Sequence, residues 1–323
     1  MPDQVTFPLA ISRSAPFRSL QQGIGQSTFR LNTIVVGLEL IADGGSKAID
    51  LPVVWKKPDT PQKARQVADQ ARQFALTSAL VYSSDLFDQF LRQLVRLKWA
   101  DFPEEVVKVV SKEVTKPEGK AYSVTERVEK LADYLNVDER TGIAMLALLI
   151  EWRNSIVHGA KTRKRSIGNS SRNVLMENSD LLSKKYSNID VSLTINRFES
   201  GEQPRRKDTT VLIASCQNLA RILDQATIRN IAKTRDGIIY LTESLLRERW
   251  NSEGGRDEYC AVWNNNKVGR RILFEKVLNQ LGISRTSKPV SACLDDGFVE
   301  DFVEQDRASL EKRLGLAAAN ATK

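Results

Sequence analysis

Arg153, Asn154 and His158 form a short polar pattern with the chemistry to act on a phosphate ester, and His158 is the only histidine in the chain. The pattern closes an apolar stretch that begins near Ile143 and is followed by Gly159, a residue typical of a helix C-terminus. Asn154 and His158 lie one helical turn apart on the same face, and Arg153 projects from the adjacent face. An arginine neutralises phosphate oxygens by paired hydrogen bonds, and an imidazole transfers protons near neutral pH. Three polar side chains at the end of an apolar helix indicate that the helix ends at a polar cleft.

The sequence Arg153-Asn154-x-x-x-His158 resembles the motif of ribonucleases in the HEPN superfamily (higher eukaryotes and prokaryotes nucleotide-binding), whose members carry it near the end of a core helix. The resemblance covers the motif and, more loosely, the helical stretch 60–235. It implies an endoribonuclease that needs neither metal nor cofactor. The ribose 2′-OH would attack the adjacent phosphorus and leave a 2′,3′-cyclic phosphate and a 5′-OH. Arg153 would stabilise the phosphate, Asn154 would orient the site and His158 would be the general acid and base.

The same resemblance has consequences for assembly and biological role. Cleavage uses both an acid and a base, and a homodimer with two facing motifs would supply two copies of His158 to one composite site. Ribonucleases of this kind often serve as toxins or anti-phage defence effectors, so an inhibitory or activating partner protein is expected. Two alternatives remain open: the helical domain only binds RNA or nucleotides and holds subunits together, or His158 is simply a helix-capping residue.

Positive charge gathers beside the motif. Residues 152–172 contain six basic side chains and no Asp or Glu, and Arg205-Arg206-Lys207 forms a second basic run. Such clusters bind phosphates with salt-sensitive, sequence-independent affinity, although a solvated surface loop explains them about equally well. The candidate RNA-binding residues are Lys161, Arg163, Lys164, Arg165 and Arg172.

Other chemistries find less support in the sequence. A metal-dependent nuclease would use Asp101 with Glu118 and Lys120, but Glu118 and Lys120 stand around a Pro/Gly turn between helices rather than on a strand. One histidine and three scattered cysteines argue against a zinc site, and no phosphate-binding Gly-x-x-x-x-Gly-Lys-Ser/Thr sequence occurs. The acidic cluster between Asp295 and Asp306 is expected to be a helix start and a solvated face, or a shield for a basic partner surface.

The N-terminal part, residues 1–58, is predicted to be a β-rich extension. Apolar residues alternate between Val5 and Ile11, where Pro8 favours an edge strand. The β-branched runs 33–41 and 48–55 flank Asp43-Gly44-Gly45 and predict a hairpin. Gly23-Ile24-Gly25 is interpreted as a flexible connection.

Residues 59–235 predict the helical domain that carries the motif. Apolar residues at helical spacing from 62 to 97, among them Val67 and Phe74, indicate one or two helices, and Ser123 with Glu126 forms a capping box. The alternation around 189–198 predicts a strand inserted in this domain. Residues 236–323 read as a helical C-terminal unit in which Trp250 and Trp263 pack the core.

The overall expectation is a mainly α protein: a HEPN-like helical bundle, a small sheet from the N-terminal region and residues 189–198, and a small helical C-terminal unit. The chain has 323 residues, a net charge of +8, 41% hydrophobic and 27% charged residues, values typical of a folded globular protein. No apolar run reaches the roughly 18 residues that predict a membrane span. The odd, dispersed cysteines favour a reducing compartment, so a cytoplasmic protein is expected.

Overall fold

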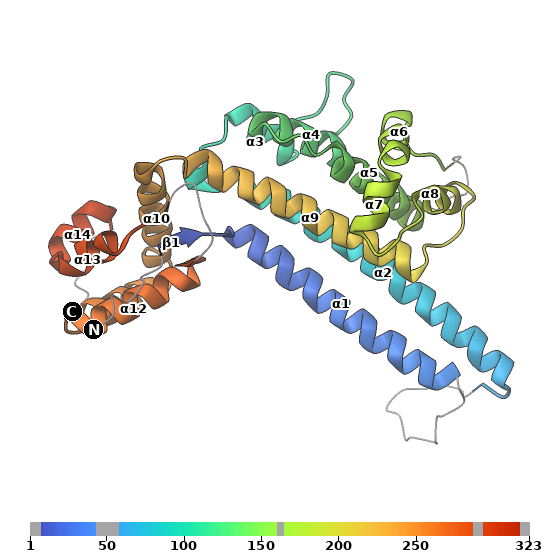
Figure 1. The fold of residues 1–323 in the computed structure, drawn as a ribbon, viewed down its shortest axis with the longest axis horizontal. Coiled ribbons are helices and arrows are strands. Elements are labelled where there is room, and N and C mark those ends of the chain that lie inside the picture. Colours follow the sequence, from blue (N-terminus) through green and yellow to red (C-terminus); the bar gives the residue numbers. More distant parts are fainter. Residues whose placement is uncertain (1–7, 43–57, 160–164, 287–292, 317–323) are drawn as a thin grey trace. The chain divides into compact units, whose positions relative to one another are not determined.

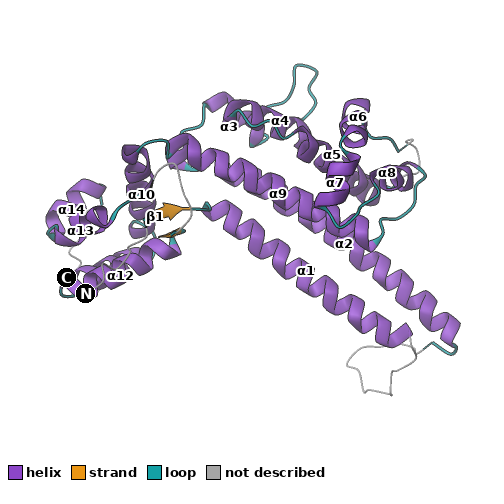
Figure 2. Ribbon diagram, in the orientation of Figure 1, coloured by secondary structure: helices purple, strands orange, loops and turns teal. Residues whose placement is uncertain are grey.

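The computed structural model describes residues 8–42, 58–159, 165–286 and 293–316, and these are mainly helical (Figures 1 and 2). The chain divides into two compact units, each assembled from separate stretches of sequence: residues 1–18, 93–107 and 221–323 form the first, and residues 19–92 and 108–220 form the second. These boundaries differ from the three consecutive domains, 1–58, 59–235 and 236–323, that the sequence predicts. The divisions fall inside helices, where no loop or change in composition marks them.

The described residues form fourteen α-helices, a 3₁₀ helix at Lys98–Ala100 and two short strands. In chain order the elements are β1 Leu9–Ile11, α1 Ala15–Ala42, α2 Pro61–Leu94, α3 Glu104–Val110, α4 Val124–Leu135, α5 Arg140–His158, α6 Asn169–Glu177, α7 Ser179–Lys185, α8 Val191–Glu199, α9 Arg206–Ile231, α10 Arg235–Trp250, α11 Gly255–Trp263, α12 Lys267–Gln280, β2 Ile283–Arg285, α13 Asp296–Glu304 and α14 Arg307–Leu314.

The predicted N-terminal hairpin is wrong for its first strand, because residues 33–41 belong to the long helix α1. Helical spacing is present along α1, where Leu31, Val35 and Leu38 are buried on one face. Burial of this face outweighs the β-propensity of the Thr33–Ile41 run. The predicted second strand, 48–55, lies outside the described residues. Of the extended N-terminal region, Leu9–Ile11 is confirmed as a strand.

Helices α1 and α2 run antiparallel within the second unit. Gly23 approaches Leu86 so closely that a Cβ on Gly23 would lie 2.7 Å from a Leu86 methyl carbon, and Arg72 pairs with Glu39 at 2.8 Å. Gly23 is therefore a packing position inside a helix and not part of a flexible connection. The α2 helix is continuous through Ser83-Ser84-Asp85.

A buried ion cluster joins α2 to α4. Arg127 of α4 is fully buried and donates to Asp88 of α2 and to the Val110 carbonyl oxygen at the end of α3. Lys112 and Arg92 also reach Asp88, at 3.2 Å and 2.8 Å. These cations hold the pKa of the Asp88 carboxyl below its usual value despite its burial. The predicted capping box at Ser123 and Glu126 is confirmed at the start of α4.

The strand predicted at 189–198 is wrong, because Val191–Glu199 form helix α8. Asp190 caps this helix by accepting a hydrogen bond from the backbone N–H of Leu193. Val191, Ile195 and Phe198 are buried while Leu193 is exposed, which is helical spacing and not alternation. Arg197 of α8 forms a buried ion pair with Asp208 of α9 at 3.1 Å, so α8 is fixed to α9.

In the first unit, β1 and β2 form a two-stranded antiparallel sheet in which Leu9 pairs with Arg285 and Ile11 with Ile283. Helices α10 to α14 enclose an aromatic core. Trp250 meets Tyr259 and Trp263 with ring centroids 5.1 and 5.4 Å apart. The prediction that Trp250 and Trp263 pack the C-terminal core is confirmed.

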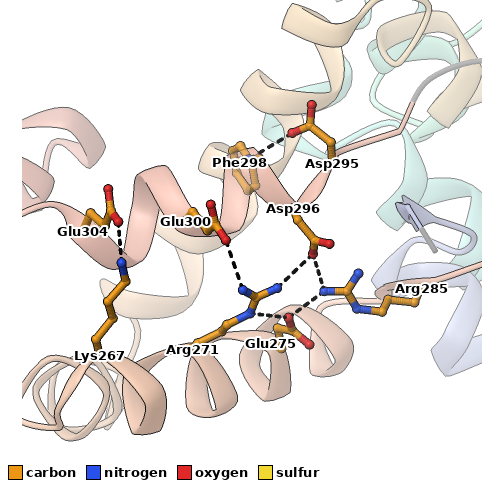
Figure 3. A network of polar contacts seen from close by, with 9 residues as sticks. All are labelled: Lys267, Arg271, Glu275, Arg285, Asp295, Asp296, Phe298, Glu300 and Glu304. Carbon is orange, nitrogen blue, oxygen red and sulfur yellow. Dashed lines mark hydrogen bonds and ion pairs between the residues drawn. The ribbon is translucent and has the colours of Figure 1, made fainter. Parts of the chain in front are cut away.

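The acidic cluster between Asp295 and Asp306 is engaged within the first unit. Asp295 and Asp306 cap α13 and α14 by accepting hydrogen bonds from backbone N–H groups. Figure 3 shows Arg271 of α12 between carboxylates of Asp296 and Glu300, at 3.0 and 3.3 Å. Internal cations and helix starts thus account for these carboxylates, which disfavours the interpretation that they shield a partner. Among the described residues, no helix is long and apolar enough to cross a membrane.

Candidate active site at the end of helix α5

Helix α5 positions the Arg153-Asn154-His158 motif. Its apolar face is buried along Met145, Leu149 and Trp152, and it packs against α4 and α6. The Trp152 ring lies 5.7 Å from that of Phe198 on α8, which anchors the last two turns. Figure 1 shows α6, α7 and α8 gathered around this end of α5. The helix ends at His158, and Gly159 takes a positive φ of 68° as the predicted C-terminal residue.

Arg153 is half-buried and only loosely held. One guanidinium nitrogen lies 3.4 Å from Asp85 Oδ1 on α2, and the other lies 3.4 Å from the Asn154 side-chain oxygen. Both distances are near the upper limit for a hydrogen bond, and the Asp85 carboxylate is largely exposed. Arg153 therefore keeps donors for an incoming anion, while Asp85 and Asn154 hold it close to the helix end.

His158 is exposed on the last turn of α5. Within the described ranges, neither of its ring nitrogens has a hydrogen-bond or ion-pair partner. Asn154 precedes it by one turn and is half-buried, so the two side chains leave the helix on the same side. An imidazole in this position reaches solvent and is accessible to a substrate, which a buried histidine is not.

The predicted RNA-binding residues have different surroundings. Lys161, Arg163 and Lys164 lie outside the described residues. Arg165 is half-buried, and its Nε is buried without a hydrogen-bond partner in the described structure. Arg172 lies on α6 and forms an ion pair with Glu199 of α8, so its charge is already partnered.

The second basic run begins helix α9. Lys207 donates to the Asn188 carbonyl oxygen at 2.7 Å, which leaves Arg205 and Arg206 as its exposed guanidinium groups. Pro204, directly before them, accepts a hydrogen bond from Gln73 of α2 at 3.1 Å. This basic run therefore lies close to Gln73 in the N-terminal half of α2.

A groove of about 510 Å³ lies beside the motif and was not predicted from the sequence. Helix α2 lines it with four side chains on one face, and the end of α5 and two loops complete it: Gln70, Gln73, Phe74 and Thr77, then Ser155, Ile156 and Gly159, then Arg165 and Gln203. Phe74, one of the apolar residues whose helical spacing predicts this helix, is 75% exposed. The only indication of this groove in the sequence was a phenylalanine close to glutamines, and a phenylalanine at that spacing fits a buried helix face equally well.

A second groove, of about 750 Å³, lies between α4, α5 and α6 and is predominantly acidic. Glu129, Asp133, Asp138 and Glu139 line it with Arg140 as the only cation. Burial, together with Glu126 and Asp133, raises the pKa of the Glu129 carboxyl. This groove repels phosphates, so the two grooves are suited to different ligands.

The residues proposed for the alternative metal-dependent nuclease lie in connections between helices. Asp101 follows the 3₁₀ helix, and Glu118 and Lys120 flank the turn between α3 and α4. In the part of the chain that the structure describes, no group of three or more His, Cys, Asp or Glu side chains is arranged to hold a metal ion.

The comparisons with known proteins add no family to these observations. Neither a family model, nor a curated protein, nor a solved structure matches this chain.

Proposed function

We propose that this protein is a metal-independent endoribonuclease similar to the HEPN ribonucleases, with Arg153, Asn154 and His158 as its active site. The observation that carries the proposal is the end of α5, where a loosely held arginine and a solvent-accessible histidine share the last turns of a well-anchored helix. The single histidine of the chain stands at the one place where the Arg-Asn-x-x-x-His spacing occurs.

The proposed reaction needs two proton transfers and a charged transition state. His158 removes the proton of the ribose 2′-OH, the 2′-oxygen attacks phosphorus, and the P–O5′ bond breaks as O5′ receives a proton. The products are a 2′,3′-cyclic phosphate and a 5′-OH. Arg153 neutralises the non-bridging oxygens as negative charge develops on them. Asn154 orients Arg153 and the substrate.

A homodimer supplies the second proton-transfer group. Val157 stands between the motif residues on the last turn of α5 and is 48% exposed, an apolar side chain that a second chain would cover. Two facing α5 ends would then provide one His158 as base and the other as acid. We further propose that the enzyme acts on cytoplasmic RNA as a toxin or defence effector whose activity a partner protein controls.

Cleavage of RNA in EDTA by the wild-type chain and by His158→Ala tests the proposal. We expect wild-type products whose 5′ ends are labelled by a kinase without prior dephosphorylation and whose 3′ ends resist a monoesterase until acid opens the ring. The His158→Ala chain should be at least about 100-fold slower, the usual contribution of a general acid or base. Equal cleavage by His158→Ala, or a strict need for Mg²⁺, would exclude the proposed mechanism.

The alternative is a non-catalytic RNA- or nucleotide-binding module. The groove beside the motif favours it as a second candidate, because a binding site there needs no histidine. The two functions differ in outcome: a wild-type chain that binds RNA but leaves it intact, alone and in cell extract, supports the binding module. Loss of cell growth on expression of wild type but not of His158→Ala supports the nuclease.

The dimer is tested with a matched pair of substitutions. Val157→Glu places a charge at the proposed contact, whereas Leu193→Glu does so on α8, where the side chain is 44% exposed. Light scattering should show a dimer for wild type and Leu193→Glu and a monomer for Val157→Glu, which should also lose cleavage. A monomeric wild-type chain that cleaves RNA would contradict the composite site.

A further inference from the structure

The groove beside the motif combines features of a site for a single nucleotide. It has an exposed aromatic ring, several side-chain amides, one guanidinium with no partner among the described residues, and a volume of about 510 Å³, within the range of small-ligand sites. No carboxylate lines it, in contrast to the acidic groove between α4, α5 and α6. Its lining is therefore neutral to positive, which suits a phosphate-bearing ligand.

Phe74 supplies the platform. Its side chain is 75% exposed at the centre of the α2 face that lines the groove. A ring left in water loses the burial that normally places phenylalanine in a core, and a nucleobase stacked on it restores that burial. Every base has a flat π face, so stacking alone is tolerant of sequence.

The amides around Phe74 supply polar contacts to the base edge. Gln70 and Gln203 make no hydrogen bonds with other described residues, so each offers both a donor and an acceptor. Gln73 uses its amide nitrogen on the Pro204 carbonyl oxygen and keeps its oxygen as an acceptor. Donors and acceptors together match the Watson–Crick edge of an unpaired base.

Arg165 supplies the phosphate contact. Its Nε is buried without a partner, and no carboxylate pairs with its guanidinium within the described ranges. The terminal nitrogens of this half-buried guanidinium also have no partner among the described residues, so they can donate to a bound phosphate oxygen. The α2–α5 groove thus brings together an aromatic ring for stacking, glutamine side chains that can hydrogen-bond to the edge of a base, and an arginine that can bind a phosphate.

We infer that this groove binds one unpaired nucleotide of a single-stranded RNA, with its base stacked on Phe74 and its phosphate on Arg165. Gly159 lines the groove and directly follows His158, so their Cα atoms are about 3.8 Å apart. The bound nucleotide is therefore a neighbour of the one whose phosphate reaches His158. This inference rests on the proposed function for its role as a substrate subsite, but the binding itself does not require cleavage.

Binding is tested with a fluorescent single-stranded 2′-O-methyl RNA, which lacks the 2′-OH nucleophile and cannot be cleaved by the proposed reaction. Fluorescence anisotropy gives the Kd for wild type, Phe74→Leu, Phe74→Trp and Arg165→Gln. Phe29→Leu is the matched control, because Phe29 on α1 is 74% exposed and does not line the groove. A base-paired duplex of the same sequence serves as the second probe.

We expect Phe74→Leu to weaken single-strand binding about tenfold, Phe74→Trp to retain it, and Phe29→Leu to leave it unchanged. Arg165→Gln should reduce the slope of log Kd against log salt by about 0.7, the value for one phosphate contact on a single strand. The affinity for the duplex should not depend on Phe74, since paired bases cannot stack on it.

Three results would overturn the subsite. They are unchanged binding by Phe74→Leu, an equal loss in Phe29→Leu, and a change of oligomeric state in Phe74→Leu by light scattering, which would identify Phe74 as a protein contact. The subsite and the nuclease fail separately. Phe74-dependent binding by a chain that never cleaves RNA would leave the subsite standing, and cleavage that Phe74→Leu does not alter would leave only the nuclease.

Discussion

Two charge-rich regions of this protein use their arginines in opposite ways. One region is the α12–α13 face, formed by Arg271, Glu275, Asp296 and Glu300 together with Arg285 of β2. Here Arg271 and Arg285 both reach Asp296, at 3.0 and 2.7 Å, and both also reach Glu275 (Figure 3). At the end of α5, Arg153 reaches one exposed carboxylate at 3.4 Å, and Arg165 reaches none among the described residues. In the first region, carboxylates neutralise the arginine charges. In the second region, the arginines remain available to bind an anion.

The difference shows that a dense set of charges does not by itself indicate a binding surface. The acidic sequence Asp295–Asp306 and the basic sequence Arg153–Arg172 are both strongly charged, and the sequence does not show which of these charges are paired. Exposed pairs between opposite charges contribute little stability and offer little to a ligand. A cation without a close carboxylate is the informative feature, and the substitutions of arginines below test this distinction.

The largest expected effect is on catalysis. Arg153→Lys keeps the charge but loses the planar fork that binds two phosphate oxygens, so cleavage should fall about 100-fold. Arg271→Lys should leave the rate unchanged, and Asp85→Asn should not lower it, because the loose Arg153–Asp85 pair is not part of the reaction. Single-turnover cleavage of labelled RNA measures all three. A rate that falls equally in the Arg153 and Arg271 variants would remove the distinction.

The next largest effect is expected on stability, at Arg127, an arginine that is fully buried and paired with a carboxylate. Arg127→Met leaves Asp88 without its buried partner and should lower the free energy of unfolding by about 3 kcal/mol. Arg92 and Lys112 remain beside Asp88, so the loss stays at the lower end for a broken buried pair. Urea denaturation followed by circular dichroism measures it. A change below about 1 kcal/mol would mean that the buried pair acts like an exposed one.

Asp224 of α9 is a buried carboxylate whose described hydrogen-bond donors are the backbone N–H and hydroxyl of Ser14. Burial raises its pKa from 3.8 to about 6, and Ser14, Arg18 and Arg13 only partly oppose that shift. The folded protein therefore holds this proton more tightly than the unfolded chain. Its contribution to stability is complete below about pH 4 and is lost as pH rises through about 6.

The loss amounts to at most about 3 kcal/mol, the free energy of a shift of about two pKa units. Comparing urea unfolding at pH 4 to 7 for wild type and Asp224→Asn isolates it. The substitution should flatten the fall in stability between pH 4 and 6. An identical pH profile in the two proteins would show that Asp224 does not titrate in this range.

The smallest effect is expected on the α12–α13 face. Arg271→Ala should lower the free energy of unfolding by no more than about 1 kcal/mol, and the difference should shrink as salt screens the pairs. Thermal unfolding at low and high ionic strength measures it. A loss as large as that of Arg127→Met would show that this half-buried network is a major stabilising element.

Local rules predicted those parts of the fold that depend on residues near one another in sequence. The capping box of Ser123 and Glu126 starts α4 as expected, and Gly159 follows α5 as expected. The motif helix was predicted because its apolar spacing and its end signal agree. The helix at Val191–Glu199 was not predicted, because Val191, Leu193 and Ile195 alternate with polar residues as in a strand. In the structure the buried residues are Val191, Ile195 and Phe198, which have helical spacing.

Contacts between segments far apart in the sequence could not be predicted from the sequence. The pairing of Leu9 with Arg285 depends on two short strands with no shared pattern, and the ion pair of Arg172 with Glu199 depends on how α6 meets α8. Phe74 has the spacing of a buried residue, and only the arrangement of α2 and α5 leaves it exposed in a groove.

The sequence by itself determined the helical character, the end of α5 and the order of Arg153, Asn154 and His158, because helix formation and side-chain spacing follow from hydrogen bonds and periodicity over a few residues. Only the tertiary structure decided which cations are paired and which side chains line a groove. Compensation of charge and exposure of an apolar ring depend on contacts between segments far apart in the chain. Those contacts made Arg271 a structural residue and left Arg153, Arg165 and Phe74 accessible to a ligand.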